Sequence, residues 1–115
     1  MGDSASVLLF SYGTLQLEVV QMSCFGRKLN GHSDAMPGYR MEMFKILDPE
    51  VVRISGKEFH PSAVPAGPLD EVSGVVFELT ESELAAADRY EVEEYKRVRV
   101  LLKSGKQAWV YIKGA

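Results

Sequence analysis

A short, unbroken apolar run near the start of the chain constrains the fold most strongly. The segment Val7–Phe10 contains no polar residue, which is typical of a strand that is buried on both faces. Tyr12-Gly13-Thr14 interrupts the run, and apolar residues then recur with helical spacing until Gly26, which is placed to end a helix. The pattern therefore predicts a buried strand that passes through a glycine into a helix over residues 15–25.

Further patterns predict a second helix and several more strands. Thr80, with Glu83 three residues later, forms a capping box, so we expect a helix from Thr80 to about Tyr90. Residues 48–71 are rich in Pro, Gly and Ser, and an excursion of this length in a small domain is expected to cover something. Strands are expected at residues 39–44, 51–54, 72–79, 95–102 and 107–112, the last two forming a hairpin.

The composition is that of an ordinary globular protein. The chain has 115 residues, of which 46% are hydrophobic and 25% charged, so it fits one domain over residues 1–115 and not a disordered chain. Five or six strands of mixed direction with two helices predict an α+β domain built on a curled sheet or small barrel. The net charge of −3 argues against nucleic-acid binding and against docking on an anionic membrane.

The cysteine content and the apolar runs bear on the compartment. The single cysteine, Cys24, cannot form an internal disulfide, and no apolar run approaches the length needed to span a bilayer. The first residues have neither a cationic region nor a long apolar stretch, so we do not expect a signal peptide. We therefore expect a cytoplasmic protein.

The glycine-containing junction after the first strand is one candidate site. A strand that runs through Gly13 into a helix directs the free backbone N–H groups of the first helical turn toward one spot, where glycine lets a ligand approach closely. The alternative is that the glycine serves only to turn the chain.

Glu91 is the second candidate. It follows Leu84 by seven positions and Ala87 by four, so the three residues share the inward face of the predicted helix. Burial, the negative end of the helix dipole and the nearby Glu93 and Glu94 should each raise the pKa of Glu91, as a general acid/base near neutral pH requires. The alternative is a frayed helix end carrying three solvated glutamates.

Other residues give weaker indications of chemistry. His32 and His60 lie 28 positions apart with no ligand spacing around them, so no metal site is expected. Cys24 is interpreted as a small core residue. Arg97 could form an ion pair with an acidic neighbour near the site, or it could be a solvated charge on an edge strand.

Several short segments along the chain form a set in order and spacing. They are Phe10–Leu15 (FSYGTL), Met36–Arg40 (MPGYR), Pro61–Val64 (PSAV) with Val72–Thr80 (VSGVVFELT), and Asp88–Glu91 (DRYE) with Tyr95–Arg97 (YKR). The set resembles the gamma-glutamylcyclotransferase-like superfamily, especially its small branch akin to the plant avirulence-induced proteins. The resemblance covers almost the whole chain.

The resemblance implies a fold and an activity. It implies a mixed, largely closed β-barrel with two flanking helices, whose cavity floor is the loop Tyr12, Gly13, Thr14 and Leu15. The activity it implies is release of 5-oxoproline and an amine from a small gamma-glutamyl amine or amino acid, with Glu91 as the acid/base. Tyr95 belongs to the implied substrate site. No cofactor or metal is implied, and we expect a small-molecule substrate and a monomer or weak homodimer.

The sequence also departs from the family pattern, and other functions stay open. Val92 replaces the family's glycine after the glutamate, and Ala87 stands where leucine is usual. Because valine resists a positive φ, the turn after the helix must differ in shape. The alternatives are a non-catalytic small-ligand-binding or regulatory domain of the same fold, and cleavage of another small amide by the same carboxylate.

Overall fold

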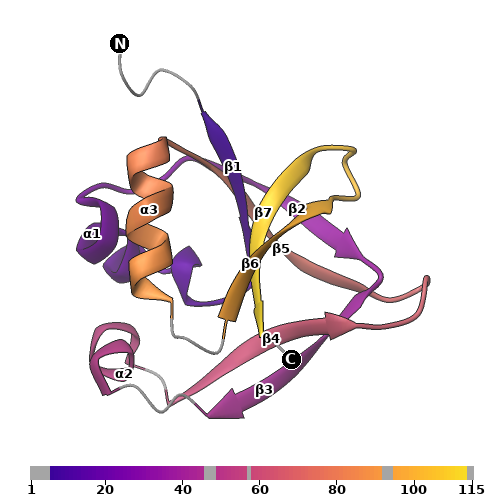
Figure 1. Cartoon of the computed structure of the whole chain (residues 1–115), viewed down its shortest axis with the longest axis horizontal. Coiled ribbons are helices and arrows are strands. Elements are labelled where there is room, and N and C mark those ends of the chain that lie inside the picture. The colour runs from indigo at the N-terminus through magenta and orange to yellow at the C-terminus, as the bar shows by residue number, and fades with distance from the viewer. Residues whose placement is uncertain (1–5, 46–48, 57, 92–94, 114–115) are drawn as a thin grey trace.

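Strand β1 (Val7–Ser11) lies at the centre of a five-stranded sheet whose order is β2-β5-β1-β7-β6 (Figure 1). The computed structural model describes residues 6–45, 49–56, 58–91 and 95–113. The other elements are η1 (Thr14–Gln16, a 3₁₀ turn), α1 (Glu18–Phe25), β2 (Gly31–Pro37), β3 (Tyr39–Lys45), α2 (Pro49–Ser55), β4 (Phe59–Pro65), β5 (Glu71–Leu79), α3 (Glu81–Tyr90), β6 (Tyr95–Leu101) and β7 (Gln107–Lys113).

The predicted double burial of the first strand is confirmed. Leu9 is 0% exposed and packs with residues of α1 and α3, whereas Phe10 is 1% exposed and packs on the opposite face with residues of β4, β5 and β7. β1 pairs antiparallel with β5 and parallel with β7, so both of its edges are hydrogen-bonded as well. Its C-terminal end, where the Tyr12–Leu15 loop begins, is therefore held on all sides.

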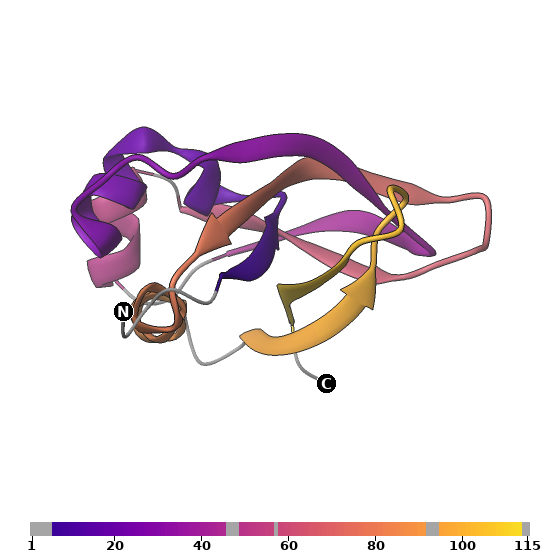
Figure 2. The same cartoon turned by 90° about the horizontal axis from the view of Figure 1, so that it is seen from above.

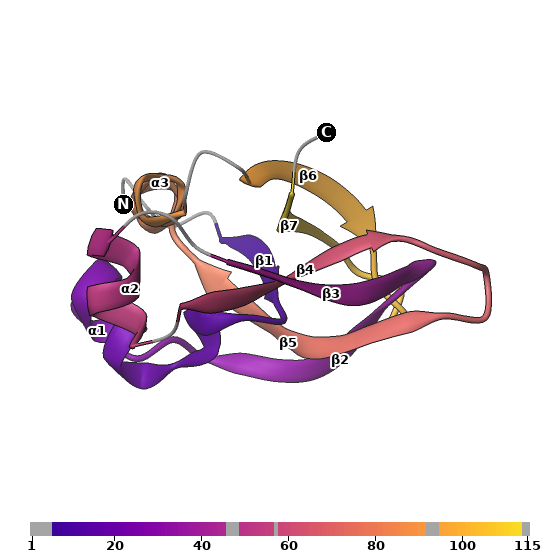
Figure 3. The same ribbon diagram turned by 90° about the horizontal axis from the view of Figure 1, so that it is seen from below.

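The helices gather at one end of the molecule (Figures 2 and 3). The antiparallel pair of β3 and β4, a long hairpin whose connection contains α2, lies along one side of the large sheet. The two predicted helices are both present, but the first begins at Glu18 and not at residue 15, because Leu17 is extended and separates α1 from the η1 turn. α1 ends at Gly26, whose φ of 71° is the left-handed cap that glycine favours. α3 has the predicted capping box, in which Thr80 and Glu83 each bond the other's backbone N–H.

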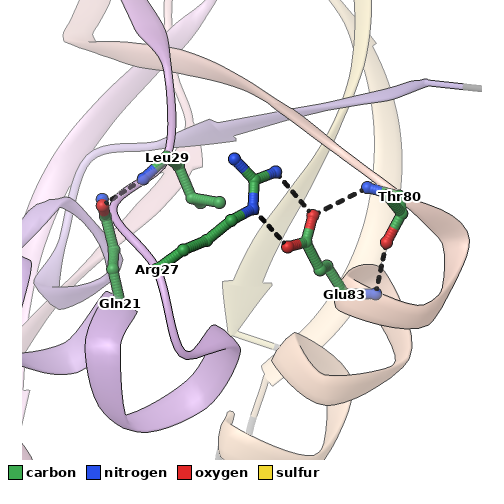
Figure 4. A network of polar contacts seen from close by, with 5 residues as sticks. All are labelled: Gln21, Arg27, Leu29, Thr80 and Glu83. Atoms are coloured by element: carbon green, nitrogen blue, oxygen red, sulfur yellow. Dashed lines mark hydrogen bonds and ion pairs between the residues drawn. The ribbon is translucent and has the colours of Figure 1, made fainter.

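A network of polar contacts joins α1 to the start of α3 (Figure 4). Just after α1, the Arg27 guanidinium donates to both carboxylate oxygens of Glu83, at 2.6 and 2.8 Å. The same carboxylate accepts the backbone N–H of Thr80, so it serves the capping box and the ion pair together. Nearby, buried Gln21 accepts the backbone N–H of Leu29 at 2.9 Å. These contacts set the position of α3, and hence of Glu91, which follows its C-terminal end.

The expectation of a strand over residues 51–54 is wrong, because these residues belong to helix α2. Pro49 occupies the first position of this helix, where its missing N–H costs nothing, and Glu50 forms an ion pair with Arg53 one turn later. The apolar side chains of Val52 and Ile54 pack against the same core as α1. Tertiary packing therefore overrides the β-branched composition of the segment.

The expectation of a largely closed barrel with two helices also needs correction. The described strands form an open five-stranded sheet with β2 and β6 at its edges, and no ladder joins those edges. β3 and β4 pair only with each other within the described residues, and three α-helices are present instead of two. Helices and hairpin cover the sheet faces, so closure is not needed to bury the core. No helix in the described part of the chain is long and apolar enough to cross a membrane.

Candidate active site

The loop after β1 contains two backbone donors for which no partner is found within the described residues. Gly13 precedes the η1 turn with φ −130°, so a positive φ is not what requires glycine here. The Gly13 N–H donates to the Ser11 hydroxyl at 3.3 Å. Among the described residues, no hydrogen-bond partner is found for the backbone N–H groups of Thr14 and Leu15. These two amides are available to hold an anionic group of a ligand.

The side chain of Tyr12 anchors this loop to the sheet and to the hairpin. Its hydroxyl donates to the Tyr111 carbonyl at 2.5 Å and accepts the Ala63 backbone N–H at 3.0 Å. Burial raises the pKa of Tyr12 to about 12, so the phenol stays neutral at physiological pH. Because its hydroxyl group is hydrogen-bonded to other parts of the fold, Tyr12 lines the pocket with its ring.

Two further hydrogen bonds fix the position of the loop. The Thr14 hydroxyl and the Tyr90 hydroxyl share a buried hydrogen bond of 2.8 Å. The Gln21 side-chain amide donates to the Leu15 carbonyl at 2.8 Å, and Gln21 is only 2% exposed. Since Tyr90 directly precedes Glu91, the Thr14–Tyr90 bond ties the loop to the C-terminal end of α3.

Glu91 caps the C-terminal end of α3, where its backbone N–H donates to the Ala87 carbonyl at 3.0 Å. The residue is partly exposed as a whole, but its carboxyl group is buried, and this burial raises the pKa of Glu91 to about 8. The predicted direction of the shift is confirmed, and desolvation is its cause. Glu93, Glu94 and Val92 lie outside the described residues.

A small pocket brings together all six residues that the sequence singles out. Tyr12, Gly13, Thr14 and Leu15 line it from the loop, Glu91 from the end of α3 and Tyr95 from the start of β6. The pocket encloses about 20 Å³, which is room for about one water molecule. Glu91, whose carboxyl has a raised pKa, and the loop residues Thr14 and Leu15 thus line the same small space.

Sequence reasoning missed one aromatic wall of this pocket, Tyr111 of β7. Its hydroxyl donates to Asp88 at 2.6 Å, and burial together with this bond raises the pKa of Tyr111. Asp88 belongs to the family-like segment Asp88–Glu91, and this is the one sequence feature that points to the contact. Tyr111 itself comes from a regular alternating strand, and nothing in its sequence neighbours sets it apart.

Of the two alternatives for Arg97, the structure shows the ion pair with an acidic neighbour, made by a side chain that stays 27% exposed. Its guanidinium contacts Asp88 at 2.9 Å and lies over the Trp109 ring, 4.4 Å from the ring centre. Because Asp88 also accepts the Tyr111 hydroxyl, Arg97 acts on the pocket through two intermediates and does not line it. Its contribution is to hold the pocket wall.

The remaining candidates play no part in the pocket. Cys24 is half-buried, and burial with the nearby Glu91 charge raises the pKa of its thiol to about 11, which leaves it protonated and unreactive. His32 is exposed on β2. Within the described residues, no group of three or more His, Cys, Asp or Glu side chains is arranged to hold a metal ion.

Comparisons with known proteins bear on the family and the fold of the chain. Residues 9–115 match the family described as gamma-glutamyl cyclotransferase, AIG2-like. A solution structure from Arabidopsis thaliana is 21% identical with a TM-score of 0.76, and the match covers 98% of this chain and 65% of that one. This chain thus spans less than two thirds of that relative.

Two further solved structures have the same fold. A second Arabidopsis thaliana protein is 25% identical with a TM-score of 0.71, and 97% of this chain matches 72% of it. A structure described as gamma-glutamyl cyclotransferase is 18% identical with a TM-score of 0.70, over 96% of this chain and 68% of that one. No functionally curated protein matches the sequence.

Proposed function

Because the chain belongs to the gamma-glutamyl cyclotransferase, AIG2-like family, we propose that it converts a small gamma-glutamyl amine or amino acid into 5-oxoproline and a free amine. The observation that carries the proposal is the buried Glu91 carboxyl, whose pKa is raised to about 8, beside the free amides of Thr14 and Leu15. A domain that only binds a ligand has no need for an ionisable group held in this environment.

The reaction is an intramolecular transfer of the glutamyl acyl group. The α-amino nitrogen of the substrate attacks its own γ-carbonyl carbon, which closes a five-membered ring and breaks the bond to the leaving nitrogen. Since nucleophile and carbonyl belong to one molecule, the protein has mainly to hold the conformer in which they meet. The amides of Thr14 and Leu15 supply donors for the substrate carboxylate or for the developing oxyanion.

Glu91 moves one proton between the two nitrogens. Its carboxylate takes a proton from the attacking amine and, as the carboxylic acid, returns it to the departing amine, so protons balance over the cycle. A pKa of about 8 lies close to that of a free α-amino group, roughly 8, which makes the proton transfer nearly balanced in both directions. An ordinary exposed glutamate would be too weak a base for this.

The test is turnover by Glu91→Gln, measured as 5-oxoproline released from a panel of gamma-glutamyl compounds. We expect the wild-type protein to release 5-oxoproline and the variant to lose ~10²–10⁴ in kcat, because the amide cannot accept the proton. Glu81→Gln, an exposed position on the same helix, is the matched control and should keep full activity. Equal rates for Glu91→Gln and wild type would contradict the proposal, and binding without product would favour the ligand-binding alternative.

A further inference from the structure

An apolar groove lies beside the small pocket, between the Gly13 loop and the β3–β4 hairpin. It encloses about 420 Å³ and is lined on the hairpin side by Met41, Met43 and Phe59, with Leu17 on the loop side. Met41 and Met43 alternate along β3, and the register with β4 places Phe59 on the same face of the hairpin. The two methionines and the phenylalanine are 42%, 63% and 52% exposed, respectively.

The groove adjoins the pocket that holds Glu91. Tyr12, Gly13 and Thr14 line both spaces, so the loop separates the buried carboxyl from the groove by a single layer of residues. The hairpin is held in this place by the hydrogen bond from Ala63 of β4 to the Tyr12 hydroxyl. For a molecule that binds at this loop with its reacting atoms toward Glu91, the groove is the adjoining space for the rest of the molecule.

The difference in volume between the pocket and the groove indicates which part of a substrate each would hold. The pocket, at about 20 Å³, has room for about one water-sized group, whereas the groove, at about 420 Å³, is within the range of small-molecule binding sites. With the γ-carbonyl at Glu91 and the carboxylate at the loop amides, the part that remains for the groove is the leaving amine. The groove thus contacts the group that distinguishes one gamma-glutamyl compound from another.

The chemistry of the groove favours an apolar leaving group. None of the described residues that line it carries a charge, so an ammonium or carboxylate in the groove would lose hydration without gaining an opposite charge. Methionine side chains are flexible and polarisable and adapt to apolar groups of varied shape. Building on the proposed function, we infer that Met41, Met43 and Phe59 form a leaving-group subsite that selects gamma-glutamyl compounds with an apolar amine.

Two matched substrate series test this subsite. In the first, gamma-glutamyl ethylamine, butylamine and hexylamine are compared, and kcat/KM should rise by ~2- to 4-fold per methylene, chiefly through KM. In the second, the hexyl compound is compared with the same chain ending in an ammonium or a carboxylate, and each charged compound should lose ~10-fold or more in kcat/KM.

A pair of variants locates the effect on the molecule. Met43→Ser should reduce the dependence of kcat/KM on chain length, while Leu69→Ser, which removes a 98% exposed leucine outside the groove, should leave it unchanged. Turnover with no preference for chain length, or with a preference for the charged compounds, would overturn the subsite and leave the proposed function standing. If no compound in either series released 5-oxoproline, the proposed function and the subsite would fall together.

Discussion

The Glu91 carboxyl combines two properties that oppose each other in a folded protein. It lines a small pocket beside the Tyr12–Leu15 loop, and its burial there penalises its charge. With a pKa of about 8, the carboxyl is mostly protonated at neutral pH in the folded chain. In the unfolded chain it is ionised at any pH above its ordinary value of 4.5. Protonation and stability are therefore linked at this residue.

Glu91 should make the protein less stable as the pH rises between about 4.5 and 8. In this window the folded state binds the proton and the unfolded state does not, so the free energy of unfolding falls with increasing pH. Glu91→Gln removes this dependence and should stabilise the protein at pH 7 by at most about 3 kcal/mol. Urea unfolding of both proteins at pH 5, 7 and 8.5 measures the difference. A stability difference that does not change with pH would contradict the raised pKa.

The buried bond between Thr14 and Tyr90 should couple the loop to the end of α3. Tyr90→Phe leaves the Thr14 hydroxyl without this partner and should cost ~1–2 kcal/mol of stability, with an accompanying rise in KM. Thr14→Val removes the other hydroxyl, and the double variant should lose less than the sum of the two single variants, by ~1 kcal/mol. Chemical denaturation of the four proteins completes the cycle. Additive losses would show that the two hydroxyl groups act independently.

At the scale of elements, the position of the Tyr12–Leu15 loop depends on how closely β5 approaches the end of β1. A Cβ atom on Gly74 would lie 2.4 Å from the Ser11 carbonyl oxygen and 2.7 Å from the Phe10 ring, closer than atoms can pack. Ser11 is the last residue of β1 before Tyr12 and Gly13. Gly74 thus lets two strands meet at the point from which the loop departs.

Gly74→Ala should therefore destabilise the protein and disturb the loop. We expect a loss of ~1–3 kcal/mol from overpacking, together with reduced ligand binding, because β1 must shift at its C-terminal end. Gly67→Ala is the control, since its Cβ would be 3.4 Å from its nearest neighbour, the Asp70 carboxylate. Thermal unfolding of the two variants compares the positions. Equal melting temperatures would mean that β5 can move aside at Gly74 without cost.

At the scale of the whole molecule, order is expected to decrease outward from β1. This strand is hydrogen-bonded on both edges and covered on both faces, whereas the β3–β4 hairpin pairs only within itself in the described residues and exposes Met41, Met43 and Phe59. Burial and hydrogen bonding together set how rarely a segment opens. The hairpin wall of the groove is therefore the part best able to adjust to a ligand.

Amide hydrogen exchange should show this gradient directly. The amides of β1 should exchange slowest, near the rate of global unfolding, and those of β3 and β4 should exchange faster by local opening. Addition of a bound gamma-glutamyl compound should slow exchange in the hairpin more than in β1, which is already protected. Equal protection of β3 and β1 in the free protein would contradict the gradient.

The sequence by itself determined those features that adjacent residues control. The buried strand over Val7–Phe10, the capping box of Thr80 and Glu83, the glycine cap after α1 and the C-terminal hairpin all follow from short patterns, because helix ends, strand faces and turns depend on residues a few positions apart. Helical spacing places Glu91 at the end of this helix in the same way, and the structure has it as the C-cap residue of α3. The six residues that the family motifs single out line one pocket, and the roles expected for them there stay a prediction.

Only the tertiary structure decided how these pieces meet. Residues 51–54 form a helix because α2 packs on the core near α1, and neither β2 nor β4 was expected as a strand. The bonds of Tyr12 with Tyr111 and of Thr14 with Tyr90 join residues 99 and 76 positions apart, and the groove needs the hairpin to lie beside the loop. Contacts over such separations depend on the path of the whole chain, and local sequence patterns do not encode that path.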